Sequence, residues 1–242
     1  MKIKKKLSVM FAAMMMFLTI SSGINTVSAE DNSEELFTQE QYEEGRKEGW
    51  IGEDTSLEDM QQLNKDSAKL EKELDENPSF IQVYSSTSST SRASNTFRAG
   101  DIIITNGVTY PILGHAGIFV GKNTILSIDG FKKHPSTKTF SRWKSDYNKG
   151  GKWTKVYRCS TSSYGPIASD WAMKHYYRSN AKYAITQNIK STSETYCSKI
   201  VYQAYLYGVG KKAIGNPLTR GYVPPYDLPI TIRNCKLRHT YK

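Results

Sequence analysis

The sequence feature that most constrains the fold is the apolar run Gly114–Gly121, in which His115 is followed by Ala, Gly, Ile, Phe and Val. Two similar runs flank it, at 102–104 and 125–128. Short runs rich in Ile, Val and Phe, bounded by Gly, Asn and Pro, are typical of buried β-strands. The sequence therefore predicts a small sheet with His115 at the head of a buried strand. Such a histidine is either a general base on rigid backbone or a core residue that bonds a backbone carbonyl.

The first 29 residues have the pattern of a secretory signal peptide. Four lysines between positions 2 and 6 precede an apolar run from Leu7 to Ile20, and Val27-Ser28-Ala29 offers small residues before a cleavage site. The apolar run is shorter than the roughly 20 residues that a membrane-spanning helix needs. We therefore predict a secreted protein, extracellular or associated with the cell wall, with no transmembrane anchor after cleavage.

The charge of the chain changes sign near residue 77. Residues 30–77 hold 17 Asp and Glu against 5 Lys and Arg, a net charge of −12, whereas residues 78–242 hold 24 Lys and Arg against 6 Asp and Glu, a net charge of +18. A basic field of this size predicts an anionic partner, which for an exported protein is a cell-wall polymer, an anionic lipid surface or an acidic peptide. No nucleic-acid-binding signature is found, so nucleic acid is not expected as a partner.

The acidic part, 30–77, reads as helical. Its apolar residues are separated by intervals of three, four and seven residues, which places them on one helix face: Leu57, Met60, Leu63, Leu70 and Leu74. A Ser/Thr-rich linker follows over 78–96, with Arg92 as a point where a protease could cut. Two alternatives stay open for the segment: a pro-region that docks on the basic domain and masks it until cleavage, or a solvated acidic spacer.

Residues 97–242 form the predicted globular domain. Strand patterns come first, then a helix that opens at Gly165-Pro166 and a second helix that carries Cys197, and a last strand over 230–238. This order is typical of the α+β class.

Cys197 is the candidate nucleophile. By this reading it lies near the N-terminus of a helix, where the unsatisfied amides and the helix dipole favour a thiolate. Tyr196 and Ser198 flank the sulfur and are candidates for oxyanion or substrate contacts. A thiolate facing the imidazole of His115 is the arrangement needed for attack on a carbonyl carbon, although a lone cysteine is more often an inert buried residue.

Four stretches together resemble a known family. They are Gly100–Ile103, His115–Gly121, Tyr196–Tyr202 and Val223–Leu228. In this order they are similar to the permuted branch of the NlpC-type papain-like cysteine peptidases and amidases, which includes lecithin:retinol acyltransferase-like enzymes. The resemblance covers about residues 97–235. It implies a circularly permuted papain-like (NlpC-type) domain with a central antiparallel sheet packed against helices.

The resemblance also implies roles for individual residues. Cys197 would be the nucleophile and His115 the base. The third polar residue of the family, usually His or Glu, falls on Ser127, which is a departure from the pattern. Asp129 lies two residues further on the same face of a strand, and a carboxylate stabilises an imidazolium better than a hydroxyl does. Both residues remain candidates for orienting the imidazole.

The other two cysteines, Cys159 and Cys235, are a possible disulfide between two strands of an exported chain. No Cys/His spacing is typical of a metal site, and no glycine-rich phosphate loop is present, so neither a metal nor a cofactor is expected.

These observations predict an exported cysteine hydrolase that cleaves peptide or isopeptide bonds, with bacterial peptidoglycan as the first substrate expected. One alternative is an acyltransferase or lipid-ester hydrolase of the same fold. Another is a catalytically weak or inactive wall-binding module, for which the departure at Ser127 is the main argument.

Overall fold

The computed structural model describes residues 37–76 and 97–242, except for 112, 160 and 219. These residues belong to one compact unit, Glu35–Lys242. The predicted signal peptide over 1–29 and the linker over 78–96 lie outside the described residues.

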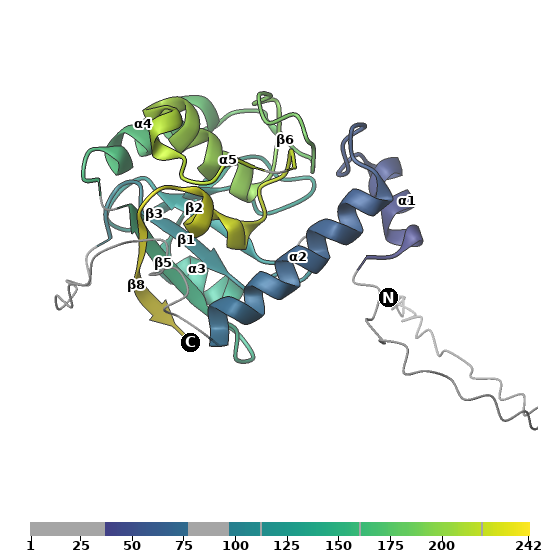
Figure 1. The fold of residues 1–242 in the computed structure, drawn as a ribbon, viewed down its shortest axis with the longest axis horizontal. Helices are drawn as coiled ribbons and strands as arrows, with labels where there is room; N and C mark the ends of the chain where they lie inside the picture. The colour runs from purple at the N-terminus through teal and green to yellow at the C-terminus, as the bar shows by residue number, and fades with distance from the viewer. Residues whose placement is uncertain (1–36, 77–96, 112, 160, 219) are drawn as a thin grey trace, which may run out of the picture. The chain divides into compact units, whose positions relative to one another are not determined.

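A six-stranded antiparallel sheet forms the centre of the fold (Figure 1). The chain pairs its first four strands in succession and then adds the later strands to the free edge of β1, so the spatial order is β4-β3-β2-β1-β5-β8. The strands are β1 (Ile102–Thr105), β2 (His115–Phe119), β3 (Thr124–Ser127), β4 (Ser136–Thr139), β5 (Thr154–Cys159) and β8 (Cys235–Tyr241). A separate parallel pair joins β6 (Lys182–Tyr183) to β7 (Glu194–Thr195).

Helices cover both faces of this sheet. Four helices follow the first strands: α3 (Phe140–Tyr147), α4 (Tyr164–Tyr176), α5 (Cys197–Gln203) and α6 (Leu228–Thr231). Helix α5 continues as a π-helical turn over Ala204–Val209, and short 3-10 turns lie at Lys211–Ala213 and Pro225–Asp227. The observed fold is therefore α+β, as the order of strand and helix patterns predicts.

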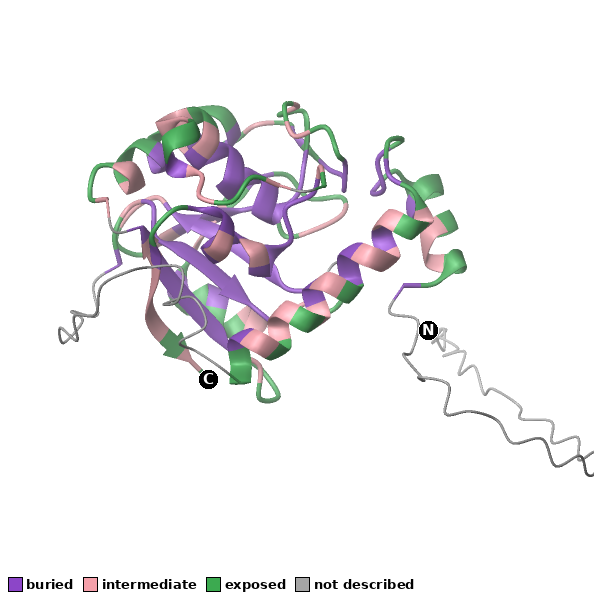
Figure 2. Ribbon diagram, viewed as in Figure 1, coloured by how far each residue is buried: buried purple, intermediate pink, exposed green. Residues whose placement is uncertain are grey.

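Covering both faces explains why the central strands are continuously apolar. Successive side chains of a strand point to opposite faces. Ile102 and Ile104 accordingly join the core cluster that holds Ile200 of α5, whereas Ile103 joins the cluster that holds Trp143 of α3. All three isoleucines are fully buried, and Figure 2 shows that burial follows the sheet.

The acidic segment forms two helices, α1 (Gln39–Glu48) and α2 (Leu57–Glu76). A capping box on Thr38 starts α1, and Gly49 ends it in the left-handed conformation with φ of 84°. Met60 and Leu63 of α2 are buried, as the spacing of apolar residues predicts.

This segment packs against the domain through polar contacts as well. The Gly52 amide and the Thr55 hydroxyl both donate to the carbonyl of Ile185, at 2.8 and 2.9 Å. The Lys155 ammonium donates to the carbonyl of Leu74 near the other end of the segment. The described part of the acidic segment therefore contributes to the same core as the sheet. Its role as a removable pro-region stays a prediction.

The predicted last strand is wrong at its start. The structure places helix α6 over Leu228–Thr231, and β8 begins only at Cys235. Pro229 lies in the first turn of α6, where a missing amide hydrogen costs nothing and the fixed φ favours a helix. Strand β4 and helix α3 are two further elements that the sequence patterns do not predict.

Candidate active site

The structure brings His115 and Cys197 together. His115 is the first residue of β2, Cys197 is the first residue of α5, and α5 packs on β2. Gly114 precedes the histidine with φ of 87°, and a Cβ there would lie 2.6 Å from the ring of Tyr226. Only glycine fits this turn without strain. Both candidates from the sequence thus lie in one site, each at the end of a regular element.

The two side chains form a thiol–imidazole pair. Burial raises the pKa of the Cys197 thiol, but the charge of His115 and its hydrogen bond to the sulfur outweigh burial and lower the pKa overall. The backbone amide of Ala116 acts in the same direction. Burial also opposes the charged form of His115, and the charge of Cys197 together with Asp129 outweighs it, which raises the pKa of His115 to about 9. The site therefore favours a thiolate beside an imidazolium at neutral pH.

The opposite side of the imidazole faces both candidates for the third residue. Ser127 Oγ lies 3.3 Å from His115 Nε2, and Asp129 Oδ1 lies 3.7 Å from the same nitrogen. The Ser127 hydroxyl donates to the carbonyl of Ala116 at 2.6 Å, so its oxygen is left to accept from Nε2–H. Because Nε2 faces these two residues, Nδ1 is the nitrogen left for Cys197. The sequence left open whether Ser127 or Asp129 orients the imidazole. In the structure both residues lie against it.

Asp129 is itself held in place. Burial raises the pKa of its carboxyl, but His115 and Lys138 outweigh burial and hold the pKa well below its usual range. Lys138 Nζ lies 2.9 Å from Asp129 Oδ2 and 3.0 Å from Asp146 Oδ2. The Tyr147 hydroxyl donates to Asp129 Oδ1 at 3.2 Å. Asp129 is thus an ionised acceptor at neutral pH.

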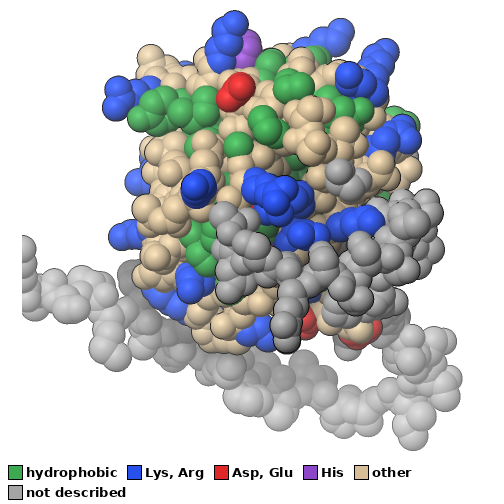
Figure 3. Space-filling model, turned by 90° about the vertical axis from the view of Figure 1, so that its left-hand side faces the viewer, with side chains coloured by type: hydrophobic (Ala, Val, Ile, Leu, Met, Phe, Trp, Pro, Cys, Tyr) green, Lys and Arg blue, Asp and Glu red, His purple; other side chains and the backbone are tan. Residues whose placement is uncertain are grey.

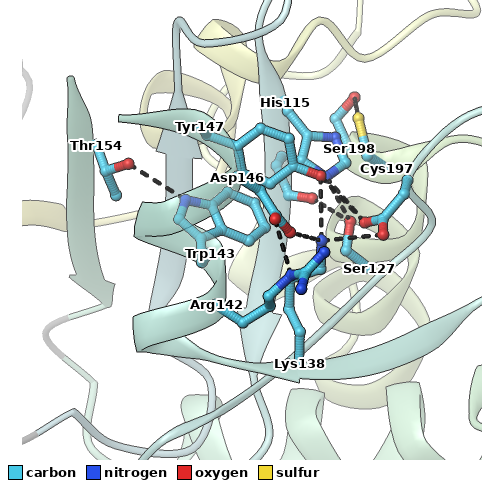
Figure 4. A network of polar contacts seen from close by, with 12 residues as sticks. His115, Ser127, Lys138, Arg142, Trp143, Asp146, Tyr147, Thr154, Cys197 and Ser198 are labelled. Atoms are coloured by element: carbon cyan, nitrogen blue, oxygen red, sulfur yellow. Dashed lines mark hydrogen bonds and ion pairs between the residues drawn. The ribbon is translucent and has the colours of Figure 1, made fainter. Parts of the chain in front are cut away.

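Sequence reasoning missed the helix that supports this network. Trp143 of α3 stacks on the His115 ring with centroids 5.0 Å apart and an interplanar angle of 15°. Its indole Nε1 donates to Thr154, which fixes the ring (Figure 4). Trp143 and Tyr147 are four residues apart and so share one helix face, which is the sequence signal that could have found them.

The predicted contacts from Tyr196 and Ser198 differ from each other. The Tyr196 hydroxyl accepts a hydrogen bond from the Val223 amide at 3.0 Å, so this side chain anchors the proline-containing loop and its hydroxyl is already engaged. Ser198 Oγ lies 4.0 Å from Cys197 Sγ, and its hydrogen bond to the sulfur is one of the contacts that lower the pKa of Cys197 (Figure 4). Ser198 is therefore a direct neighbour of the sulfur, whereas the Tyr196 hydroxyl binds the backbone of the loop that contains Val223.

Cys159 and Cys235 lie opposite each other in the register of β5 and β8, but the predicted disulfide is not formed in this structure. The Cys159 thiol instead donates to the carbonyl of Arg233 at 3.4 Å. Burial raises the pKa of both thiols, which keeps them protonated and unreactive. Cys197 differs from both, because among the three its pKa alone is lowered.

The site is closed in this structure. Cys197 is 4% exposed and His115 is 3% exposed. Burial and the charge of Cys197 raise the pKa of the Tyr183 phenol, and burial and Glu71 raise the pKa of the Tyr226 phenol. The Tyr226 hydroxyl also donates to Glu71 of α2 at 3.3 Å, which links the acidic segment to the wall of the site. Within 37–76 and 97–242, no group of three or more His, Cys, Asp or Glu could hold a metal ion.

Fold and site together define a class. An α+β domain holds a helix-end cysteine with a lowered pKa against a strand-borne histidine and its orienting carboxylate. This arrangement is the one that nucleophilic catalysis through an S-acyl intermediate requires.

Comparison with known proteins names the family within this class. The family described as "Lipoprotein N-acylation protein LnsA-like" matches residues 71–228, and the chain belongs to it. A relative from Bacillus thuringiensis, described as "Uncharacterized 30.3 kDa protein", is 33% identical over 142 residues, which cover 55% of this chain and 52% of the relative. The chain therefore spans about half the length of that curated relative. No solved structure matches this chain.

The family assignment changes the functional expectation. It gives no support to the prediction of a peptidoglycan hydrolase or of any peptidase, because N-acylation forms an amide bond and does not cleave one. It favours the alternative of an acyltransferase, and it agrees with a place in the cell envelope. Among the helices that the structure describes, none has the length and apolar character needed to span a bilayer.

Proposed function

We propose that the protein is an acyltransferase that moves an acyl group onto the amine of a lipoprotein through a thioester on Cys197. The observation that carries this proposal is the buried pair of Cys197 and His115 in a chain that belongs to an N-acylation family. The permuted papain-like arrangement of the domain, suggested by the order of histidine before cysteine, is part of the same proposal.

The first half-reaction forms the acyl-enzyme. The Cys197 thiolate attacks the carbonyl carbon of an acyl ester, such as that of a glycerolipid, and the backbone amides at the start of α5 are the candidate donors to the developing oxyanion. The imidazolium of His115 then gives its proton to the leaving alkoxide as the ester C–O bond breaks. The products are a thioester on Sγ, an alcohol and a neutral imidazole.

The second half-reaction forms the amide. A neutral amine attacks the thioester carbonyl, and the imidazole of His115 accepts the amine proton as the C–S bond breaks. The thiolate and imidazolium are restored, so the cycle needs no cofactor. Asp129 and Ser127 orient the imidazole in both halves. Transfer to an amine requires that water does not compete for the thioester, and the burial of Cys197, which is 4% exposed, limits the access of water to it.

The test follows the two half-reactions by intact-protein mass spectrometry. The full chain in detergent micelles is incubated with a phosphatidylglycerol of one defined acyl chain, and we expect a mass increase of one acyl group that hydroxylamine removes. Cys197→Ala should abolish the adduct. Cys159→Ala, which removes a buried thiol of raised pKa, is the matched control and should retain it.

A lipopeptide with a free α-amine is then added to the acylated enzyme. We expect the adduct to disappear with a rate that depends on the lipopeptide, and the N-acyl lipopeptide to accumulate. An acetylated lipopeptide without the free amine is the control. Release of free fatty acid at the same rate with either peptide would show a hydrolase and overturn the proposal, as would an adduct that never forms.

A further inference from the structure

A cavity lies at the opposite end of β1 from the pair of Cys197 and His115. In the pairing of β1 with β2, Thr105 lies opposite His115. The cavity instead meets the start of β1, where Gly100 and Asp101 are among its lining residues. At about 3.4 Å per residue, a strand of this length separates the two sites by roughly 10 Å or more. The cavity has a volume of about 320 Å³ and is not part of the site described above.

The lining of this cavity is strongly basic. Its charged residues are one carboxylate, Asp101, and four cations, Arg98, Arg158, Lys236 and Arg238, so the net charge is +3. Figure 3 shows a face of the molecule on which Lys and Arg side chains are gathered and acidic side chains are sparse.

The single carboxylate is already neutralised. Arg158 donates from Nε and Nη2 to the two oxygens of Asp101, at 2.6 Å each. The backbone amide of Arg98 donates to Asp101 Oδ2 at 2.9 Å. Asp101 is 1% exposed and therefore cannot serve as a counter-ion for a further cation in the cavity. Asp101 therefore does not cancel the positive charges of Arg98 and Arg238.

One of these cations has an unmet hydrogen-bonding requirement. The Nε atom of Arg238 is buried, and the described residues offer it no hydrogen-bond partner. Buried donors of this kind are rare in folded proteins, because an unpaired donor costs about 1–3 kcal/mol. A bound anion would supply the acceptor that the described residues do not offer.

The backbone adds further donors at the same place. Helix α4, Tyr164–Tyr176, starts at the cavity without a side-chain cap on its N-terminus. Gly165 of its first turn packs so tightly on Gly100 that a Cβ on Gly100 would lie 2.0 Å from the Gly165 Cα. The hydroxyl residues Thr161 and Ser162 complete the lining. Cations, hydroxyls and the positive end of a helix therefore converge on one rigid recess.

We propose that this cavity binds a phosphate ester, either of a soluble metabolite or of an anionic phospholipid headgroup. A phosphate carries several acceptor oxygens on one centre, which suits a recess with guanidinium and backbone donors on several sides. The volume accommodates a phosphate with a small substituent such as glycerol. On a phospholipid, this contact would dock the domain on the membrane surface. The proposal does not depend on the chemistry of Cys197.

The first arm of the test measures soluble ligands by isothermal titration calorimetry on the full chain at low salt. Glycerol 3-phosphate and inorganic phosphate are titrated into the wild type and into the double variant Arg98→Gln/Arg238→Gln. We expect binding by the wild type and affinity at least tenfold weaker in the variant. The matched control, Lys133→Gln/Lys174→Gln, removes two exposed charges from outside the cavity and should bind as the wild type does.

The second arm distinguishes the two sources of phosphate by vesicle co-sedimentation. If a lipid headgroup is the ligand, the wild type sediments with phosphatidylglycerol vesicles and not with phosphatidylcholine vesicles. The cavity variant then loses this binding, and glycerol 3-phosphate competes with the vesicles for the wild type. If a soluble ester is the ligand, the cavity variant loses affinity in the calorimeter and sediments as wild type does. Equal affinity of wild type and cavity variant in both arms would overturn the proposal, and so would an equal loss in the lysine control.

The cavity variants also separate this proposal from the proposed function. Because Arg98 and Arg238 lie outside the catalytic pair, acyl-enzyme formation from a donor in detergent micelles should be unchanged in the double variant. Loss of phosphate binding with normal acylation supports the cavity alone. Absence of acylation in wild type would overturn the acyltransferase and leave the phosphate site standing.

Discussion

The strength of the contact between Asp129 and His115 can be tested by replacing Asp129 with Asn. The substitution keeps the size of the side chain and its capacity to accept a hydrogen bond, but it removes the negative charge that lies 3.7 Å from His115 Nε2. We expect the imidazolium to be less stable, so the pKa of His115, which is about 9 in the wild type, should fall.

The size of the fall follows from the distance and the exposure. Two unit charges separated by 3.7 Å interact by about 1 kcal/mol in water and by about 4.5 kcal/mol at an effective dielectric constant of 20. The Asp129 side chain is 34% exposed and is also paired with Lys138, so solvent and the ammonium screen it and the lower half of this range applies. A change of roughly 1–2.7 kcal/mol corresponds to a fall in the pKa of His115 of about one to two units.

The assay is an NMR titration of the histidine ring protons between pH 5 and pH 10. The sequence holds only four histidines, so the spectrum is simple, and the resonance lost in His115→Gln assigns the signal. The other three histidines report on the sample as internal controls. In Asp129→Asn, the midpoint of His115 should move down while theirs stay in place.

Two further variants make the result decisive. Asp170→Asn removes a carboxylate from an exposed position on α4 and should leave the His115 midpoint unchanged. Ser127→Ala removes a neutral acceptor and should lower the midpoint by less than half as much as Asp129→Asn. An unchanged midpoint in Asp129→Asn, or a larger effect from Ser127→Ala, would refute the view that the carboxylate stabilises the imidazolium.

Three other predictions concern stability. Gly100→Ala places a methyl group 2.0 Å from the Gly165 Cα at a φ of 87°, so the urea unfolding free energy should fall by about 2–4 kcal/mol, and a loss under 1 kcal/mol would contradict the tight packing. Burial and the charge of Asp66 raise the pKa of Asp227 to about 6, so its stabilising contribution is present below pH 4 and is lost as the pH rises through 6. Asp227→Asn should therefore be more stable than wild type by about 1–3 kcal/mol at pH 7.5 and equal to it at pH 4, whereas a gain that is the same at both pH values would refute the assignment. Glu71→Ala leaves its two partly buried donors without an acceptor, so thermal unfolding should show a loss of about 2 kcal/mol, and an unchanged melting temperature would mean that water replaces the carboxylate.

Much of the candidate site could be predicted from local patterns. His115 and Cys197 were recognisable because each stands at the edge of a short apolar element, and such elements are encoded by neighbouring residues. Ser127 and Asp129 followed from counting along a strand, where alternate residues share a face. The order of these residues also suggested a resemblance to thiol enzymes, and the family assignment narrowed the expected reaction toward acyl transfer.

The supporting residues could not be predicted in the same way. Lys138 reaches Asp129 only because β4 pairs with β3, and Trp143 reaches the imidazole only because α3 covers the second face of the sheet. Nothing in the sequence near these residues specifies that pairing, since it depends on contacts between segments far apart in the chain. The same reason explains why Tyr196 was expected to contact substrate, although its hydroxyl holds a loop 27 residues further on.

The sequence by itself determined the strands around His115, the helix that carries Cys197, the α+β class, the charge of each part and the two candidate catalytic side chains. These properties depend on the spacing of apolar residues and on side-chain chemistry, both of which are local. Only the tertiary structure decided that the acidic helices share the core of the basic domain, that a carboxylate and a hydroxyl meet one imidazole nitrogen, and that four cations line a recess at the far end of β1. Those features depend on contacts between segments that are far apart in the sequence. Such contacts form only when the whole chain packs.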